Sequence, residues 1–225
     1  MSLPLAEIVP WGRNRDEYER MFALTPTDQQ KRILDAGGGP ASFNATWPGP
    51  VVSIDPVYAY SADQIHKRIE STFELIIGNL KTNSTGYLWE KISSPEDLGA
   101  VRMAAMQVFL EDYRARREGR YVAGMLPYLP FAPDSFDLAL CSHLLFTYSS
   151  IMDYATHETA TLDLLRLAPE VRIFPLIDTS GHDSLHLKPL RERLAVLGHA
   201  SEIVPVDYHF QRGANTMLKI VRKAD

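Results

Sequence analysis

The stretch ILDAGGGPASF, residues 33–43, places three consecutive glycines directly after a short apolar run. The run from Arg32 to Leu34 is a predicted strand, and Pro40 suits the first position of a helix, where its missing N–H is not needed. That helix is predicted to end near Trp47, before a Pro-Gly-Pro break. Because glycine has no Cβ and tolerates positive φ, such a loop lets the backbone lie close to a ligand.

The rest of the chain alternates between strand and helix patterns. The last two β-rich stretches, 201–210 and 215–221, are joined by so few residues that they permit a hairpin and not a parallel crossover. The sequence therefore predicts an α/β fold with a mostly parallel seven-stranded sheet and a C-terminal antiparallel hairpin. The other expected strands are 51–54, 121–123, 136–141 and 171–177, and the expected helices include 14–24, 159–167 and 184–197.

A long segment, residues 62–119, separates the second predicted strand from the third. Apolar residues recur in it at helical spacing, first from Ile65 to Leu80 and again from Leu98 to Tyr113. A strand-to-strand crossover needs only about a dozen residues. The excess predicts a helical insertion on top of the crossover helix, serving as a lid or specificity element within a single domain that spans residues 1–225.

Composition limits the function. The chain has 225 residues, 45% of them hydrophobic, and a formal net charge of -5, which argues against nucleic acid as the partner. The lone cysteine, Cys141, excludes an internal disulfide and fits a reducing compartment. Residues 1–11 lack a signal-peptide pattern, and no run of 18 apolar residues occurs. We expect a cytoplasmic protein with no membrane segment; the oligomeric state stays open.

Three ligand classes compete for the glycine loop. A P-loop ends in Gly-Lys-Ser/Thr, and the chain contains no Gly-Lys pair. A dinucleotide fingerprint would use Gly37 and Gly39 but has Ser42 in place of its third glycine, and Pro40 removes an amide near the pyrophosphate. Asp35, directly before the glycines, also conflicts with a pyrophosphate. It suits a ligand that carries an ammonium or a sulfonium group.

The segment LDAGGGPA, residues 34–41, resembles motif I of class I S-adenosylmethionine (SAM) dependent methyltransferases, D/E-x-G-x-G-x-G/A. Asp55 closes the second strand twenty residues after Asp35, where this family carries an acid. The segment YLPFAPDSFDLALCSHLLF, residues 128–146, resembles the family's loop and fourth strand, and the closing antiparallel pair matches its final strands. The opening stretch WGRNRDEYERMF, 11–22, also resembles a group of uncharacterised bacterial proteins of this fold.

The resemblance implies a Rossmann-like fold and methyl transfer from SAM, with S-adenosylhomocysteine as product. In the family the glycine loop holds the amino-acid end of the cofactor and the acid after the second strand takes the ribose hydroxyls. Where the family often has Gly-Asp to accept the adenine amino group, this chain has Gly124 and Met125. The residues implied to bind the cofactor are Asp35, Gly37, Gly38, Gly39, Pro40, Asp55, Met125, Leu126 and Ser142.

Several side chains have a functional and a structural interpretation. Arg13 could bind the cofactor carboxylate as a guanidinium fork or form a surface salt bridge. His143, just past the fourth strand, is the candidate catalytic base, or it only bonds backbone. Tyr87 and Trp89 line a substrate pocket or form the core of the insertion. His182 and His186 stand four residues apart but lack a third ligand, so no metal site is predicted.

The leading hypothesis is a SAM-dependent methyltransferase acting on a small molecule. One alternative is a regulatory or structural protein that binds SAM without turnover. A second is methylation of RNA or protein, against which the acidic balance and the lack of an Asn/Asp-Pro-Pro-Tyr motif argue. A third is a dinucleotide oxidoreductase, which would bind NAD in preference to SAM.

Overall fold

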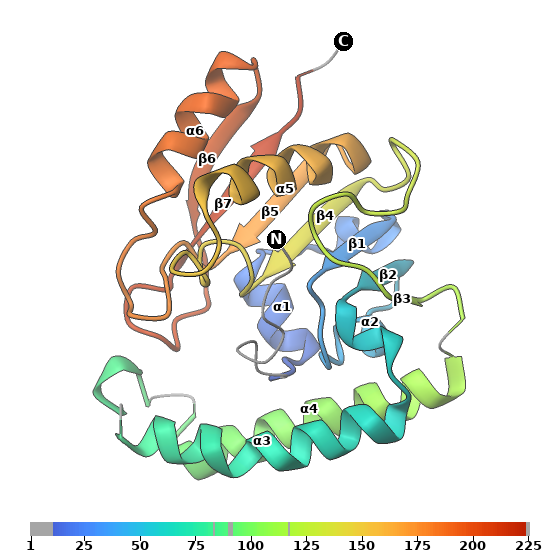
Figure 1. The fold of residues 1–225 in the computed structure, drawn as a ribbon, viewed down its shortest axis with the longest axis vertical. Coiled ribbons are helices and arrows are strands. Elements are labelled where there is room, and N and C mark those ends of the chain that lie inside the picture. The colour runs from blue at the N-terminus through green and yellow to red at the C-terminus, as the bar shows by residue number, and fades with distance from the viewer. Residues whose placement is uncertain (1–10, 83, 90–91, 117, 224–225) are drawn as a thin grey trace.

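The computed structural model describes residues 11–82, 84–89, 92–116 and 118–223. Its centre is a seven-stranded sheet in the order β3-β2-β1-β4-β5-β7-β6 (Figure 1). The pairs among β1 to β5 are parallel, whereas β7 runs antiparallel to both β5 and β6. The predicted fold, a mostly parallel Rossmann-like sheet with a C-terminal antiparallel hairpin, is confirmed.

The elements follow the predicted order along the chain. The strands are β1 (Ile33–Ala36), β2 (Val51–Ile54), β3 (Tyr121–Val122), β4 (Leu138–Ser142), β5 (Glu170–Phe174), β6 (Ala200–Pro205) and β7 (Thr216–Val221). The helices are α1 (Arg15–Met21), α2 (Phe43–Thr46), α3 (Ala62–Thr82), α4 (Pro95–Arg116), α5 (Tyr154–Leu167) and α6 (Leu187–Val196). Short 3-10 turns are η1 (Pro26–Gln30), η2 (Pro56–Ala59) and η3 (Ser84–Gly86).

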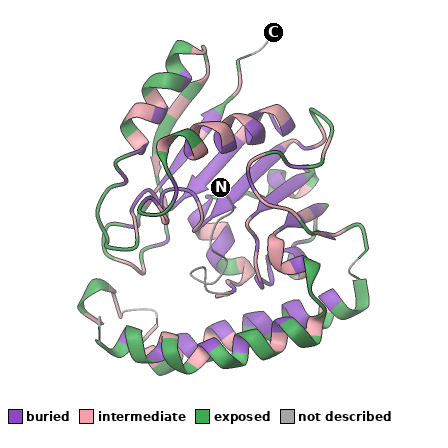
Figure 2. Cartoon of the chain, in the orientation of Figure 1, coloured by how far each residue is buried: buried purple, intermediate pink, exposed green. Residues whose placement is uncertain are grey.

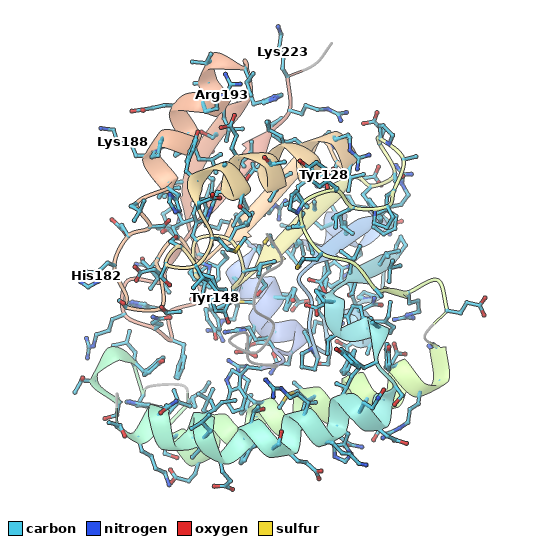
Figure 3. The ribbon with its side chains drawn as sticks, viewed as in Figure 1. Tyr128, Tyr148, His182, Lys188, Arg193 and Lys223 are labelled. Atoms are coloured by element: carbon cyan, nitrogen blue, oxygen red, sulfur yellow. The ribbon has the colours of Figure 1, made fainter. Side chains whose placement is uncertain are left out.

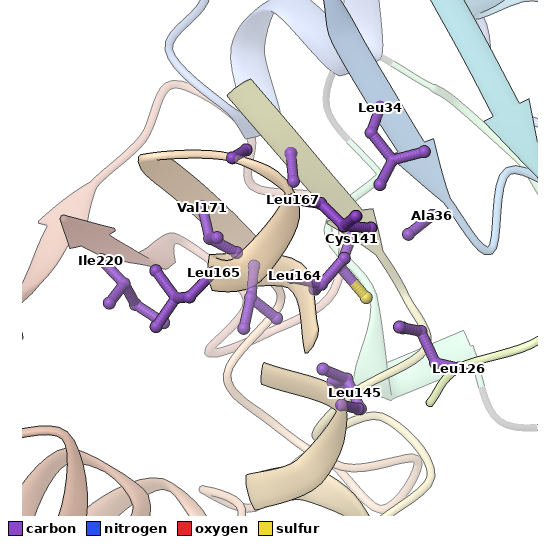
Figure 4. Close-up of a cluster of buried hydrophobic side chains, with 14 of the residues drawn as sticks. Leu34, Ala36, Leu126, Cys141, Leu145, Leu164, Leu165, Leu167, Val171 and Ile220 are labelled. Atoms are coloured by element: carbon purple, nitrogen blue, oxygen red, sulfur yellow. The ribbon is translucent and has the colours of Figure 1, made fainter. Parts of the chain in front are cut away.

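Alternation along the central strands divides the core into two layers. Alternate residues of a strand point to opposite faces, so Leu34 and Cys141 join one cluster while Ile33 and Leu140 join the other. The first cluster packs beneath α5 and α6, and Figure 4 shows Leu34, Ala36 and Cys141 among its members with Leu164 and Leu165 of α5. The second packs against α1 and α2. Figure 2 shows the buried residues concentrated on the sheet.

The first helix begins where the sequence predicts it. Asn14 caps α1 by accepting from the Glu17 amide, and the Glu17 side chain accepts in turn from the Asn14 amide. This reciprocal pair satisfies two amides that a helix start leaves without intrahelical partners. The cap therefore fixes Tyr18, one turn further on, against the sheet.

The prediction that Pro40 begins the next helix is wrong. The Ala41 amide donates to the Gly38 carbonyl, so Pro40 lies inside a turn. The Ser42 amide donates to the Arg13 carbonyl, and α2 begins only at Phe43. Proline is compatible both with the first position of a helix and with this turn, because neither position requires a backbone N–H donor. Contact with the segment before α1 decides between them.

The long segment between β2 and β3 consists mainly of two helices, α3 and α4, which lie side by side across one end of the sheet (Figure 1). α3 leads away from β2 and α4 returns to β3, so the described part of this segment holds more helix than a simple crossover needs, and the division into insertion and crossover helix stays a prediction. An aromatic cluster that includes Tyr58, Phe109, Tyr113 and Tyr121 joins the pair to the sheet edge. Ile77, Leu80 and Leu98 form a smaller core at the other end.

Within the described residues, no helix combines the length and apolar character needed to cross a membrane. The start of the chain, for which no signal-peptide pattern is predicted, lies outside the described residues up to residue 10.

Candidate functional site

A cavity of about 870 Å³ lies at the carboxyl ends of β1, β2 and β4. Its volume falls within the range of small-molecule sites, and ligands of open α/β sheets bind at this edge. The segments after the strands form one wall and the inner face of α3 forms another. Its lining includes residues 37–41, 54–57, 124–126, 142–144, 147 and 148, together with Trp11, Arg13, Tyr18, Gln64, Arg68 and Asn79.

The three glycines of the loop serve different purposes. Gly37 and Gly39 have φ of +74° and +51°, in the left-handed region. A Cβ on Gly38 would stand 2.3 Å from the Asp35 Oδ2 atom, which excludes any larger residue. A Cβ on Gly39 would meet only Asp55, with Oδ2 at 3.9 Å. Gly39 is therefore the glycine that leaves room for a ligand.

Asp35 does not line the cavity. It is 1% exposed and accepts hydrogen bonds from the Tyr18 hydroxyl at 3.0 Å and the Ser53 hydroxyl at 2.8 Å. Burial raises the pKa of its carboxyl to about 6, against the effect of these two donors. The predicted direct contact between Asp35 and a ligand finds no support in this arrangement, because the carboxylate is buried against Tyr18 and Ser53 and is not part of the cavity lining.

Asp55 lines the cavity and also holds the loops around it. Its Oδ2 accepts from the Gly39 amide at 3.0 Å and its Oδ1 from the Val57 amide at 2.8 Å. Burial raises the pKa of this carboxyl to about 6, with the two amides opposing the shift. A carboxylate has about four lone-pair sites, so two acceptor positions remain for hydroxyl groups of a ligand.

The segment after β3 supplies an apolar part of the lining. Gly124, Met125 and Leu126 all line the cavity. A Cβ on Gly124 would stand 2.6 Å from the Ile54 Cδ1 atom, so glycine is needed for the segment to lie against β2. Met125 and Leu126 present no acidic group and could wall a flat ring by contact alone.

Arg13 is a cavity-lining cation beside a second buried guanidinium. Its Nε is buried and has no hydrogen-bond partner among the described residues. Arg102 of α4, 1% exposed, pairs with Glu17 and lies 3.4 Å from the Tyr208 hydroxyl. One carboxylate therefore faces two guanidinium groups. Burial, followed by repulsion from Arg102, lowers the pKa of Arg13, and an anion bound at the cavity would relieve both effects.

Ser142 and His143 end β4 at the cavity. His143 has φ of +51°, a conformation rare for residues with side chains and concentrated at functional sites. Its Nδ1 lies 3.0 Å from the Ser142 hydroxyl. Burial, with smaller effects of Arg13 and Arg102, holds the pKa of His143 well below its usual value. The ring is therefore neutral at physiological pH and can accept a proton, but by itself it is a weak base.

Other candidates of the sequence separate into cavity residues and core residues. Tyr87 lines the cavity, whereas Trp89 packs against Phe210. Cys141 is buried, which raises the pKa of its thiol to about 12.

The far end of the helix pair is attached to the β6–β7 connection. Backbone hydrogen bonds join residues 84–89 to residues 206–215, such as the one from the Leu88 amide to the Phe210 carbonyl.

The two histidines spaced four apart do not meet. His186 is buried against His157 and bonds the Met152 carbonyl, while His182 is exposed and lies at the periphery in Figure 3. Among the described residues, no group of three or more histidine, cysteine or acidic side chains could hold a metal ion.

Two features of the site escaped the sequence analysis. Tyr18 lies at a core-facing position of α1, yet it is part of the cavity lining and its hydroxyl donates to Asp35. Its signal was present, since a tyrosine on a buried face needs a partner for its hydroxyl. The inner face of α3 brings Gln64, Arg68 and Asn79 to the opposite wall. Nothing local distinguishes these three from other polar residues of a long helix.

By sequence, the chain belongs to the family of the uncharacterized protein MJ0045 of Methanocaldococcus jannaschii. The two are 30% identical over an alignment 225 residues long, and the alignment covers 98% of this chain and 99% of the relative. That relative is archaeal, so the predicted bacterial group stays a prediction. No protein-family model matches the chain.

By structure, the chain is similar to SAM-dependent methyltransferases. A SAM-dependent methyltransferase of Thermotoga maritima has a TM-score of 0.45 and 13% identity, with 92% of this chain and 88% of the other covered. The magnesium protoporphyrin IX methyltransferase of Synechocystis PCC 6803 with bound SAM gives 0.42 and 13%, covering 86% and 71%. A methyltransferase of Aquifex aeolicus gives 0.40 and 11%, covering 91% and 92%.

Proposed function

We propose that this chain is a SAM-dependent methyltransferase that acts on a small-molecule acceptor. The observation that carries the proposal is the arrangement around Gly39. There a loop without side chains and the residues Asp55 and Arg13 line one cavity at the strand ends, and the Arg13 Nε has no hydrogen-bond partner among the described residues. These groups match a ligand that has a carboxylate and a pair of hydroxyls, as SAM does.

The residues present fit the cofactor. We assign Arg13 and residues 37–40 to its amino-acid end, Asp55 to the ribose and Met125 with Leu126 to the adenine. Ser142 lines the same cavity and stays among the proposed contacts. Asp35 contributes indirectly in this proposal, since its carboxylate positions Tyr18, whose side chain lines the cavity.

SAM, when bound, supplies a methyl group on a sulfonium. The sulfur is a good leaving group, because it departs as a neutral thioether. The chain then has to align the nucleophile, exclude water and accept a proton where the nucleophile carries one. His143 is our proposed proton acceptor. The α3–α4 pair, residues 62–119, is the proposed lid and specificity element of a single domain, because α3 covers the side of the cavity opposite the strand ends. We retain the cytoplasm as the proposed compartment.

The first test is isothermal titration of the purified protein with SAM, S-adenosylhomocysteine and NAD in parallel. Micromolar binding of the two sulfur ligands and none of NAD would support the proposal. Preference for NAD would replace it with the oxidoreductase hypothesis. Binding of SAM with no methyl transfer to any acceptor in a small-molecule screen would favour the binding protein without turnover.

A further inference from the structure

The connection between β4 and α5 follows a strained path along the cavity. His143 and Phe146 have φ of +51° and +66°, in the left-handed region that residues with side chains rarely adopt. Leu144, which lies between them, lines the cavity as His143 does. It also lies against the glycine loop, because a Cβ on Gly37 would stand 2.8 Å from the Leu144 Cδ2 atom. The path of this connection therefore places both the candidate base and a support of the glycine loop.

Phe146 is held in its conformation by hydrogen bonds to both of its backbone groups. Its amide donates to the Nε2 atom of His157, a residue of α5, at 3.1 Å. Its carbonyl accepts from the Ser149 hydroxyl at 2.6 Å. A strained backbone conformation persists only where the surrounding structure holds it. Ser149 belongs to the same connection as Phe146, whereas His157 ties Phe146 to a helix.

Both ring nitrogens of His157 have partners, which fixes where the ring carries its proton. Nδ1 lies 2.8 Å from the Asp153 carbonyl, which only accepts, so Nδ1 is the protonated nitrogen. Nε2 is then the acceptor for the Phe146 amide. His157 is 0% exposed, and burial lowers its pKa to about 4, so the ring is neutral at physiological pH. A charged ring would turn a second N–H toward the Phe146 amide and lose this bond.

The two ends of the strained stretch are bonded to another part of the sheet. The His143 amide donates to the Phe174 carbonyl at the end of β5, at 2.7 Å. The Thr147 carbonyl accepts from the Thr179 amide at 3.1 Å. Loss of the bond at Phe146 would therefore shift the residues between these two anchors and leave the rest of the connection in place.

We propose that His157 is a positioning residue of the site, whose neutral ring holds Phe146 and thereby sets where His143 and Leu144 stand at the cavity. This inference rests on the proposed function for the roles of those two residues, a proton acceptor and a support of the cofactor loop. His157 is not part of the cavity lining, so it touches no ligand there and acts through the β4–α5 connection.

The test compares two substitutions of His157. His157→Gln keeps a neutral acceptor, since the amide oxygen of glutamine lies as many bonds from Cβ as the imidazole Nε2 does. His157→Leu has no acceptor and leaves the Phe146 amide without its partner. Leu164→Ala is the matched control, because it removes a fully buried side chain from the same helix and has no part in the bond to Phe146.

The first readout needs no ligand. Long-range ¹H–¹⁵N correlation spectra of uniformly ¹⁵N-labelled protein at pH 7.5 report the histidine rings, with His143→Gln and His157→Gln as assignment variants. We expect the wild-type His157 ring to be neutral and protonated on Nδ1. The ring signals of His143 should shift in His157→Leu and keep their wild-type positions in His157→Gln and Leu164→Ala.

The second readout is calorimetric titration with S-adenosylhomocysteine, at a temperature where circular dichroism shows each variant to be folded. We expect affinity to fall at least about tenfold in His157→Leu, because Leu144 no longer supports the glycine loop in place. It should stay within about threefold of wild type in His157→Gln and in Leu164→Ala. A loss of stability alone would affect the control as well.

Three results would overturn the positioning role. They are a wild-type His157 ring protonated on Nε2, His143 signals that do not change in His157→Leu, and equal changes of affinity in His157→Gln and His157→Leu. If His157→Leu does not fold, the wild-type tautomer and the His143 signals of His157→Gln decide. If S-adenosylhomocysteine does not bind the wild type, the proposed function fails, whereas the spectra of the free protein still decide the role of His157.

Discussion

The two walls of the cavity are built on different principles. The wall at the strand ends is held by the sheet, because its residues directly follow β1, β2, β3 and β4, and the parallel pairing sets the position of each strand end. The opposite wall is one face of α3, a helix placed by side-chain packing at its two ends and, through α4, by the buried Arg102–Glu17 pair. The position of the strand-end wall is therefore fixed by the sheet, whereas the position of the helical wall depends on side-chain packing.

That difference suggests a division of labour. A rigid wall suits a ligand that every family member would bind, and a wall built on one inserted pair of helices suits an acceptor that differs between enzymes. Among the described lining residues, the charged ones are Arg13, Asp55 and Arg68, and only Arg68 belongs to the helical wall. Four substitutions test this division, in order of decreasing expected effect.

The largest effect is expected from Arg102→Ala, which breaks the attachment of the helical wall. Arg102 is 1% exposed and its pair with Glu17 joins α4 to α1, so the variant removes the ion-pair partner of a buried carboxylate. We expect a loss of about 3–5 kcal/mol in the free energy of unfolding. Chemical denaturation measures it.

The control is Arg114→Ala, which removes an exposed pair with Asp63 from the same helix. It should cost less than about 1 kcal/mol. Equal losses in the two variants would show that the buried pair does not anchor α4.

The second effect concerns Asp35 under the strand-end wall. Its pKa is raised from the ordinary 3.8 of an aspartate to about 6 in the folded chain, so folding favours the protonated form. The stability that the proton contributes is present at low pH and is lost as pH rises from about 4 to 6. Relative to Asp35→Asn, wild type should therefore lose on the order of 2–3 kcal/mol between pH 4 and pH 7. Chemical denaturation of both proteins at pH 4 and pH 7 measures this change. If the difference in unfolding free energy between wild type and Asp35→Asn is the same at both pH values, the raised pKa is contradicted.

The third test separates backbone strain from ligand contact. Gly39 and Gly119 both have positive φ, of +51° and +74°, but only Gly39 lines the cavity, and a Cβ on Gly119 would meet nothing within 4 Å. Alanine at either position should cost a similar stability of roughly 1 kcal/mol. Only Gly39→Ala should also weaken S-adenosylhomocysteine binding, by about 10–200-fold, because one methyl group enters the cavity. Similar affinities in the two variants by calorimetry would remove the glycine loop from the cofactor site.

The smallest effect is expected from Arg68→Gln on the helical wall. Arg68 is exposed at the cavity, and it belongs to α3, which contributes none of the residues assigned to the cofactor. We expect affinity for S-adenosylhomocysteine to change by less than about twofold, which is below 0.5 kcal/mol. A loss of tenfold or more would show that the helical wall holds the cofactor as well, and the two walls would no longer differ in role.

Much of the strand-end wall could be predicted from the sequence, for a local reason. A strand followed by Gly37 to Gly39, and another followed by Asp55, bring these residues to one edge once the strands pair in parallel. The position of Pro40 was predicted wrongly because the start of α2 depends on a hydrogen bond to Arg13, which is distant in sequence. The interior position of Asp35 was missed because it depends on Tyr18 and Ser53, which approach from two other elements.

For the helical wall, the sequence predicts the helix but not the residues of it that face the cavity. The spacing of Ile65 and Ile69 indicates a buried face, and both residues are buried. It does not indicate which polar neighbours face the cavity, since that depends on how α4 packs beneath α3. The length of the segment likewise does not reveal which of its helices makes the return to the sheet.

The most direct test of the proposed cofactor site is a crystal structure of the protein with S-adenosylhomocysteine. The division between the two walls predicts the ligand at the strand ends, with its carboxylate at Arg13, its ribose hydroxyls on Asp55 and its adenine beside Met125. The side of the cavity toward Arg68 should stay free for an acceptor. A ligand held mainly by α3, or bound outside this cavity, would contradict the assignment.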